Sequence, residues 1–235
     1  MHAQSGSAGT GWRSLDGPVA RTALVVWFAF VTSVCFLALT LPYFAFERLV
    51  GWQPTHLALW LGAVSLAPVA PAARGLLGAV HALVEEREHP GHAIRRFVDG
   101  IRGASVGLRR SWWAVPVVAL LLGYDAALYG PAAPVVPVLI AVAALAVTIL
   151  FVGASVLDVY GAGAQAWWPT VHRAGVLVLR RPLVALAWSA LLVLTVLVSR
   201  LPLVGPSLVL VLPAAWAGGV DVVARGRGFG GASGR

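Results

Sequence analysis

The sequence predicts an all-α protein, a polytopic transmembrane helix bundle of about six spans. Three observations predict this fold class. Of the 235 residues, 59% are hydrophobic and only 11% are charged, whereas soluble domains carry about 25% charged residues. The mean hydropathy is +0.85. The apolar residues also fall into segments of about 20, the length with which a helix crosses the hydrocarbon core of a bilayer.

One transmembrane domain is predicted over residues 21–225, between a disordered leader at 1–20 and a disordered tail at 226–235. Its predicted spans lie near residues 22–42, 56–84, 112–129, 134–157, 182–199 and 201–222. The last two are joined by the very short link at 201–203, so they could instead form one hairpin. Prolines within the second and sixth spans predict kinks, and the small residues beside them permit close helix contacts.

The arginines predict the orientation. All 17 basic residues are Arg. With the N-terminus in the cytoplasm, inner segments hold most of them, outer segments hold only Arg48 and Arg200, and Arg74 lies inside the second span. Because basic loops stay in the cytoplasm, we expect an N-in, C-in topology and an even number of spans. Arginines that border apolar segments favour the anionic membrane surface over nucleic acid as the partner.

Two inner segments have the pattern of amphipathic helices that lie in the membrane interface. In 91–110, apolar residues fall on one helical face and charged residues on the other, and 167–181 is similar. Each segment ends in an Arg-Arg pair that leads into a span, which indicates either an internal duplication or a coincidence. The predicted membrane-surface residues are Arg95, Arg96, Arg102, Arg109, Arg110, Arg180 and Arg181.

Three ionisable residues are candidates for substrate binding: Arg74, Asp125 and Asp221. A charge at the centre of a span costs about 2.5–3.5 kcal/mol, so it normally faces the bundle and pairs. Asp221 and Asp158 are the candidate partners of Arg74. This arginine either contacts an anion or substrate, extends its side chain to the inner interface, or forms a structural ion pair. Asp125, near the outer end of the third span, is either a coupling carboxylate or a solvated helix end.

Catalytic, metal and cofactor signals are weak. His81, Glu85, His89 and His92 are close enough in sequence to form a metal shell, but they lack any familiar zinc spacing, and an ordinary charged helix end explains them better. No nucleophile elbow, zinc-protease or P-loop motif occurs. The lone Cys35 excludes an intrachain disulfide. We therefore predict no catalytic residues, no metal and no cofactor.

Three stretches resemble a known family, the YesL-like small integral membrane proteins. They are HLALWLGAVSLAPVAPAARGLLGAVHALVEER (56–87), AIRRFVDGIRGASVGLRRSWWAVPVVALLLGYDAALYG (93–130), and VHRAGVLVLRRPLVALAWSALLVL (171–194) with RLPLVGPSLVLVLPAAWAGGVDVV (200–223). The resemblance covers about two thirds of the chain and departs at Arg74, where the family usually has a small polar residue. The family has no assigned function and is found mainly in Gram-positive bacteria. Its members often lie beside carbohydrate-uptake genes, which implies a permease-associated role.

These observations predict a non-enzymatic protein of the bacterial cytoplasmic membrane. Its expected role is an accessory or assembly partner of a transport system, with anionic lipid head groups and transporter subunits as partners. Two alternatives stay open at this point. One is a small transporter with a midplane site near Arg74, and the other is a membrane enzyme that acts on lipid-linked substrates.

Overall fold

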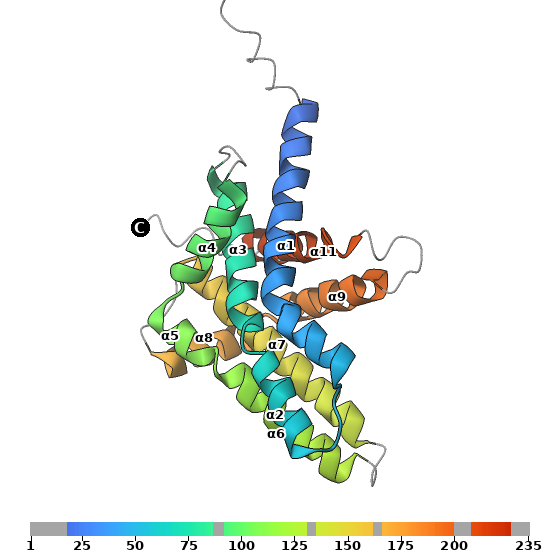
Figure 1. Ribbon diagram of the computed structural model, residues 1–235. Helices are drawn as coiled ribbons and strands as arrows, with labels where there is room; N and C mark the ends of the chain where they lie inside the picture. The colour runs from blue at the N-terminus through green and yellow to red at the C-terminus, as the bar shows by residue number, and fades with distance from the viewer. Residues whose placement is uncertain (1–17, 87–91, 131–134, 162–165, 200–207, 227–235) are drawn as a thin grey trace, which may run out of the picture.

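The structure, a computed structural model, describes residues 18–86, 92–130, 135–161, 166–199 and 208–226 (Figure 1). These ranges are all-helical and contain no strand, which confirms the predicted all-α class. The helices are α1 (Pro18–Leu49), α2 (His56–Ser65), α3 (Val69–Glu86), α4 (Ala93–Arg102), α5 (Val106–Ser111), α6 (Ala114–Tyr129), α7 (Val136–Val159), α8 (Trp167–Arg180), α9 (Pro182–Ser199) and α11 (Leu212–Gly226).

Four helical stretches of the described chain are long and apolar enough to cross a membrane. They are Thr22–Leu49, His56–Glu85, Val106–Tyr129 and Val136–Val159. The pair α8 and α9 passes the same test as a single span bent by 97°, which raises the number to five. The structure thus supports four or five spanning helices where the sequence predicted six.

The predicted sixth span is described only in part. Residues 200–207 lie outside the described residues, and α11 contains only 15 residues. At 1.5 Å per residue it is about 22 Å long, short of the roughly 30 Å of the hydrocarbon core. The described part of 201–222 is therefore too short to count as a span, and the part before Leu208 lies outside the described residues.

Two other predicted boundaries shift. The first helix is longer than the predicted span, because it already begins at Pro18, a residue suited to a first helical turn, and continues through Pro42 to Leu49. The second predicted span is broken at 66–68 into α2 and α3. Pro68 explains the break, since its ring disfavours the helical conformation of the residue before it. Residues 18–20 of the predicted leader and Gly226 of the predicted tail are helical, and the rest of both, 1–17 and 227–235, lies outside the described residues.

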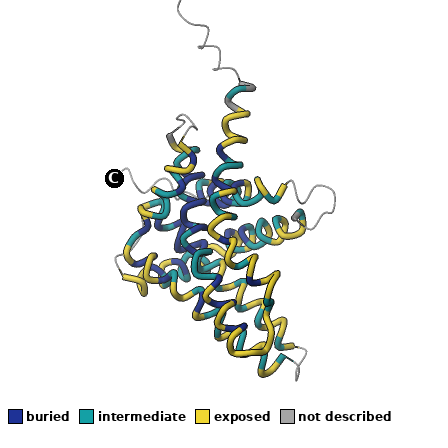
Figure 2. Tube along the Cα trace, in the orientation of Figure 1, coloured by how far each residue is buried: buried dark blue, intermediate teal, exposed yellow. Residues whose placement is uncertain are grey.

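Helix α3 is the centre of the bundle and contacts α1, α4, α7 and α11. Burial is densest where α3 meets α1 and α11, as Figure 2 shows. Leu76 of α3 and Ala217 and Val220 of α11 are fully buried in this core, and Phe28 of α1 packs among them. The arm formed by α2, α6 and the first half of α7 is mostly exposed in the same view.

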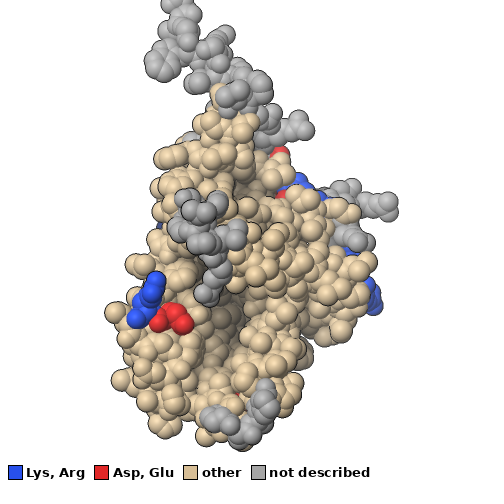
Figure 3. All heavy atoms as spheres, turned by 90° about the vertical axis from the view of Figure 1, so that its right-hand side faces the viewer, with Lys and Arg blue, Asp and Glu red and all other residues tan. Residues whose placement is uncertain are grey.

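The exposed surface is largely apolar. Leu57 of α2, Leu128 of α6 and Val138 of α7 are each at least 60% exposed. The face in Figure 3 carries almost no charge apart from one small group of both signs and a few charges near its margin. A continuous apolar surface of this kind is costly in water and favourable in lipid. The described chain therefore has the surface of an integral membrane protein.

Glycines set the close contact between α3 and α4. A Cβ at Gly100 of α4 would lie 2.8 Å from the carbonyl oxygen of Gly75, and one at Gly78 would lie 2.9 Å from the Cα of Gly100. Only hydrogen fits at such distances, so the two backbones touch. The predicted role of the small residues near Pro71 is consistent with this contact.

A serine ties α11 to α1. The backbone N–H of Ala214 donates to Ser33 Oγ at 3.1 Å, and Ser33 is fully buried. This N–H belongs to the first turn of α11, where it has no partner within the helix. Ser33 therefore supplies the acceptor that lets this helix begin inside the bundle.

Candidate functional site

The first part of the candidate site is a buried ion pair between α3 and α7. Arg74 Nε donates to Asp158 Oδ2 at 2.9 Å, and only 7% and 2% of the two side chains are exposed. Of the two partners predicted for Arg74, the structure thus selects Asp158. The pair forms because the last turn of α7 brings its carboxylate beside the middle of α3.

The same carboxylate also holds the start of α5. The backbone N–H of Ser105 donates to Asp158 Oδ1 at 3.1 Å, and Ser105 Oγ in turn accepts from the Leu108 N–H at 3.3 Å. Ser105 is thus the N-cap of α5. The single amphipathic helix predicted for 91–110 is wrong in this respect, because the chain turns at 103–105 and forms two helices, α4 and α5.

A second buried cluster lies two helical turns further along α3. Asp221 of α11 accepts three hydrogen bonds there. His81 Nδ1 and Tyr160 Oη approach its Oδ1, each at 2.9 Å, and Arg225 Nε donates to its Oδ2 at 2.7 Å. On the other side of the imidazole, Nε2 lies 3.3 Å from Glu85 Oε1. We call these five residues the α3–α7–α11 cluster.

The hydrogen-bond directions in this cluster follow from its acceptors. A carboxylate only accepts, so His81 Nδ1 carries the proton that is shared with Asp221. Arg225 Nη2 lies 3.2 Å from the same nitrogen, which cannot then accept from it. The guanidinium instead donates to the His81 carbonyl oxygen at 3.4 Å. The Asp221 carboxylate thus has three donors, one of them the oppositely charged Arg225.

Two groups of the cluster lie outside the candidate spans and have shifted pKa values. Burial, followed by the hydrogen bond to Asp221, raises the pKa of the Tyr160 hydroxyl well above its usual range. Burial alone would lower the pKa of Arg225, but the hydrogen bond and charge of Asp221 outweigh it and raise that pKa. Both shifts favour the observed state, a neutral phenol and a charged guanidinium around one carboxylate.

The structure therefore separates the three predicted substrate-binding residues. Arg74 and Asp221 are buried, but each has its own partners and belongs to a different cluster. Asp125 is exposed on α6, far from both in the fold, beside Tyr124, whose hydroxyl lies 2.8 Å from His56 Nδ1. The three do not converge on one ligand site.

The weak metal hypothesis gains no support among the described residues. No group of three or more His, Cys, Asp or Glu side chains that could hold a metal ion occurs there. His81 and Glu85 are close together, His92 is exposed at the start of α4, and His89 lies outside the described residues.

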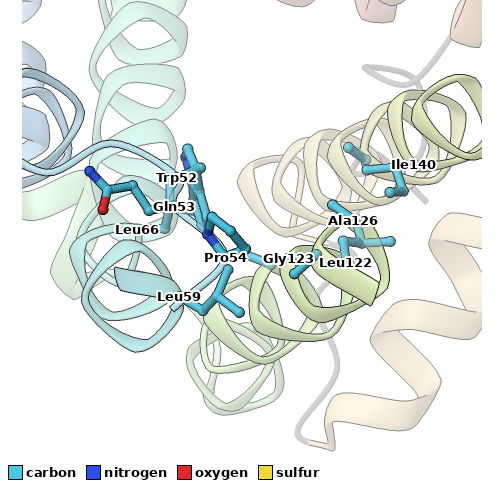
Figure 4. Close-up of a pocket in the computed structure, with 12 residues that line it drawn as sticks. Trp52, Gln53, Pro54, Leu59, Leu66, Leu122, Gly123, Ala126 and Ile140 are labelled. Atoms are coloured by element: carbon cyan, nitrogen blue, oxygen red, sulfur yellow. The ribbon is translucent and has the colours of Figure 1, made fainter. Parts of the chain in front are cut away.

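Two cavities of the described chain are apolar. A cleft of about 530 Å³ lies between the 52–54 loop, α2, α6 and α7, lined mainly by Trp52, Leu59, Leu122 and Ile140 (Figure 4). The Gln53 amide at its edge donates to the Val50 carbonyl oxygen. A second cavity of about 260 Å³ is lined by side chains of α1, α3, α6, α7, α9 and α11. Arg74 lines neither cavity.

The predicted membrane-surface arginines gather on α4, α5 and the corner between α8 and α9. Figure 1 shows α4, α5 and α8 along the left-hand side of the molecule, and α5 packs against α8. Arg95, Arg102, Arg109, Arg110, Arg180 and Arg181 are exposed, and Arg96 is half-buried. Close by, the only exposed acidic side chain of α4, α5 and α8 is Asp99, paired with Arg95 at 3.6 Å.

Fold and site together define a helical membrane protein with paired buried charges and an arginine-rich surface at one side. Comparisons with protein-family models, curated proteins and solved structures find no match to this chain.

Four polar residues of these contacts were not singled out from the sequence: Ser33, Ser105, Tyr160 and Arg225. One of them had a usable signal, since Arg225 stands four residues after Asp221 and shares its helix face. The others depend on which helices meet. Ser105, for example, caps α5 and donates its N–H to a carboxylate of α7, and nothing in the sequence around Ser105 indicates that second contact.

Proposed function

We propose that this chain is a non-enzymatic accessory or assembly partner of a transport system in the bacterial cytoplasmic membrane. The resemblance to the YesL-like family makes carbohydrate uptake the expected substrate class. One observation carries the proposal: the buried ionisable groups are satisfied by one another, while the arginines of α4 and α5 face outward. The charged groups that a partner could bind are thus these exposed arginines.

In this proposal both termini lie in the cytoplasm, and α4, α5 and α8 lie at the inner membrane interface. Placing the arginine-rich helices inside satisfies the positive-inside rule. Helices α9 and α11 pack against each other. In this topology they form one hairpin, in which α9 leads away from the cytoplasm and α11 leads back. The exposed apolar side chains of Ile94 and Val106, 61% and 46% exposed, then lie among the arginines.

The transporter alternative requires a polar cavity that reaches Arg74. The Arg74 guanidinium is paired with Asp158. The cleft and the second cavity are lined by other, mainly apolar, side chains and do not reach Arg74. The enzyme alternative requires a free reactive group, whereas both oxygens of Asp221 already accept hydrogen bonds. Both observations favour the accessory role over these alternatives.

Site-directed photocrosslinking in native membranes tests the proposal. A benzophenone amino acid is placed at Ile94 or Val106, and at Val138 of α7 as a lipid-facing control of similar exposure, 60%. We expect a discrete crosslink to a transport protein from the first two positions and none from the control. Recovery of only monomer or homodimer at all three positions would contradict the proposal. So would sugar uptake by proteoliposomes of the purified chain that is lost in Arg74→Met.

A further inference from the structure

A pocket of about 360 Å³ lies where the end of α7 meets α8. Its floor is apolar, formed by Leu157 of α7 and by Val176 and Leu177 of α8. Its rim is basic, formed by His172, Arg173, Arg180 and Arg181. Among the described residues, no acidic side chain lines it. The nearest carboxylate in sequence, Asp158, is turned toward Arg74 and Ser105.

The spacing along α8 produces this combination. Arg173, Leu177 and Arg180 stand at positions i, i+4 and i+7, so they share one helical face with the leucine between the two arginines. The rise between the arginines is about 10 Å at 1.5 Å per residue. The adjacent face is fixed in the protein, because Ala174 is fully buried with Ala154 and Leu108. The two arginines are therefore held on a rigid support.

The surroundings of the pocket are apolar and exposed. Leu179 of α8 is 81% exposed, and Leu183, in the first turn of α9, is 62% exposed. The Trp167 and Trp168 side chains at the other end of α8 are 48% and 62% exposed, and indoles favour the membrane interface. The axes of α8 and α9 differ by 97°, so α8 runs nearly perpendicular to the apolar helix α9. Arg180 and Arg181 stand at the bend between them.

From this geometry we propose that the pocket binds one anionic glycerophospholipid. Guanidinium groups at the rim, Arg180 foremost, hold the head-group phosphate, for which the planar fork of arginine is well matched. The acyl chains run past Leu179 and Leu183 along α9. An acidic protein segment could also bind Arg180, but it would leave these two leucines uncovered, so the lipid is the better fit. The inference goes beyond the proposed function, which assigns the partner-binding surface to α4 and α5, and shares with it only the placement of α8 at the membrane interface.

Native mass spectrometry of the full chain in mild detergent tests this site. The delipidated protein is titrated with dioleoyl phosphatidylglycerol or dioleoyl phosphatidylcholine. We expect one phosphatidylglycerol to be retained at least about tenfold more strongly than phosphatidylcholine. The double variant Arg173→Gln/Arg180→Gln should lose that preference. The matched control Arg95→Gln/Arg102→Gln removes the same charge from α4 and should keep it.

Several outcomes would overturn the proposal. Equal retention of the two lipids by the wild-type chain would do so, and so would equal losses in both double variants, which would indicate a diffuse charge effect. Displacement of the lipid by millimolar inorganic phosphate would show a site for a soluble anion. A photoactivatable phosphatidylglycerol, used on the wild-type chain alone, should label α8 and the first turn of α9. Label spread evenly over α6 and α7, or an acidic protein crosslinked to α8 in its place, would contradict a lipid site.

Discussion

The ion pair between Arg74 and Asp158 allows the sharpest test of the structure. The perturbation is Asp158→Asn, which removes the charge but keeps the shape and one oxygen that can accept from the Ser105 N–H. Arg74 is then left charged and 7% exposed. It cannot turn aside easily, because its Nη1 lies close to Gly78 at the contact with α4.

The expected loss follows from the buried state of the pair. Removing one partner of a buried ion pair costs about 3–5 kcal/mol. Because the amide retains the hydrogen bond to Ser105, we expect the lower end, about 3 kcal/mol, more than a hundredfold in the unfolding equilibrium. The double variant Arg74→Met/Asp158→Asn leaves no unpaired charge and should recover to within about 1 kcal/mol of the wild type.

The measurement is reversible unfolding in mixed dodecylmaltoside and SDS micelles, followed by tryptophan fluorescence. Asp125→Asn is the matched control, since that carboxylate is exposed, and it should change the free energy of unfolding by less than about 0.5 kcal/mol. Additive losses in the double variant would refute the reasoning, because they would mean that the two residues do not interact.

Three further predictions use the same unfolding assay. Gly100→Ala should destabilise the protein by about 1–3 kcal/mol, since its Cβ would strike the α3 backbone, whereas Gly175→Ala, whose Cβ would make only an ordinary contact with Leu150 Cδ2 at 3.9 Å, should be neutral or stabilising. Ser33→Ala should cost about 1–3 kcal/mol, because it orphans a buried N–H of α11; no loss would contradict that hydrogen bond. Tyr160→Phe should cost about 1 kcal/mol at neutral pH. Because the pKa of Tyr160 is raised in the folded state, wild-type stability should be level below about pH 10 and fall as the pH rises further, and the variant should show a smaller fall.

The sequence by itself determined the class of fold and the approximate places of the four long apolar stretches. Composition decides the class, because a chain that is 59% hydrophobic and 11% charged needs lipid as its solvent. Segment length predicts the helices, because an apolar segment of about 20 residues in lipid must form its backbone hydrogen bonds within itself. The need for Arg74 to find a partner was equally readable, and Asp158 was one of two candidates.

Only the tertiary structure decided which partner Arg74 takes and where the described helices bend. The choice of Asp158 over Asp221 depends on the packing of α3 against α7 and on the Ser105 N–H that shares the carboxylate. Hydropathy could not foresee the 97° bend between α8 and α9, because a sum over residues does not register the direction of the chain. Pairing and helix ends are set by contacts between segments far apart in sequence, and for that physical reason local patterns do not contain them.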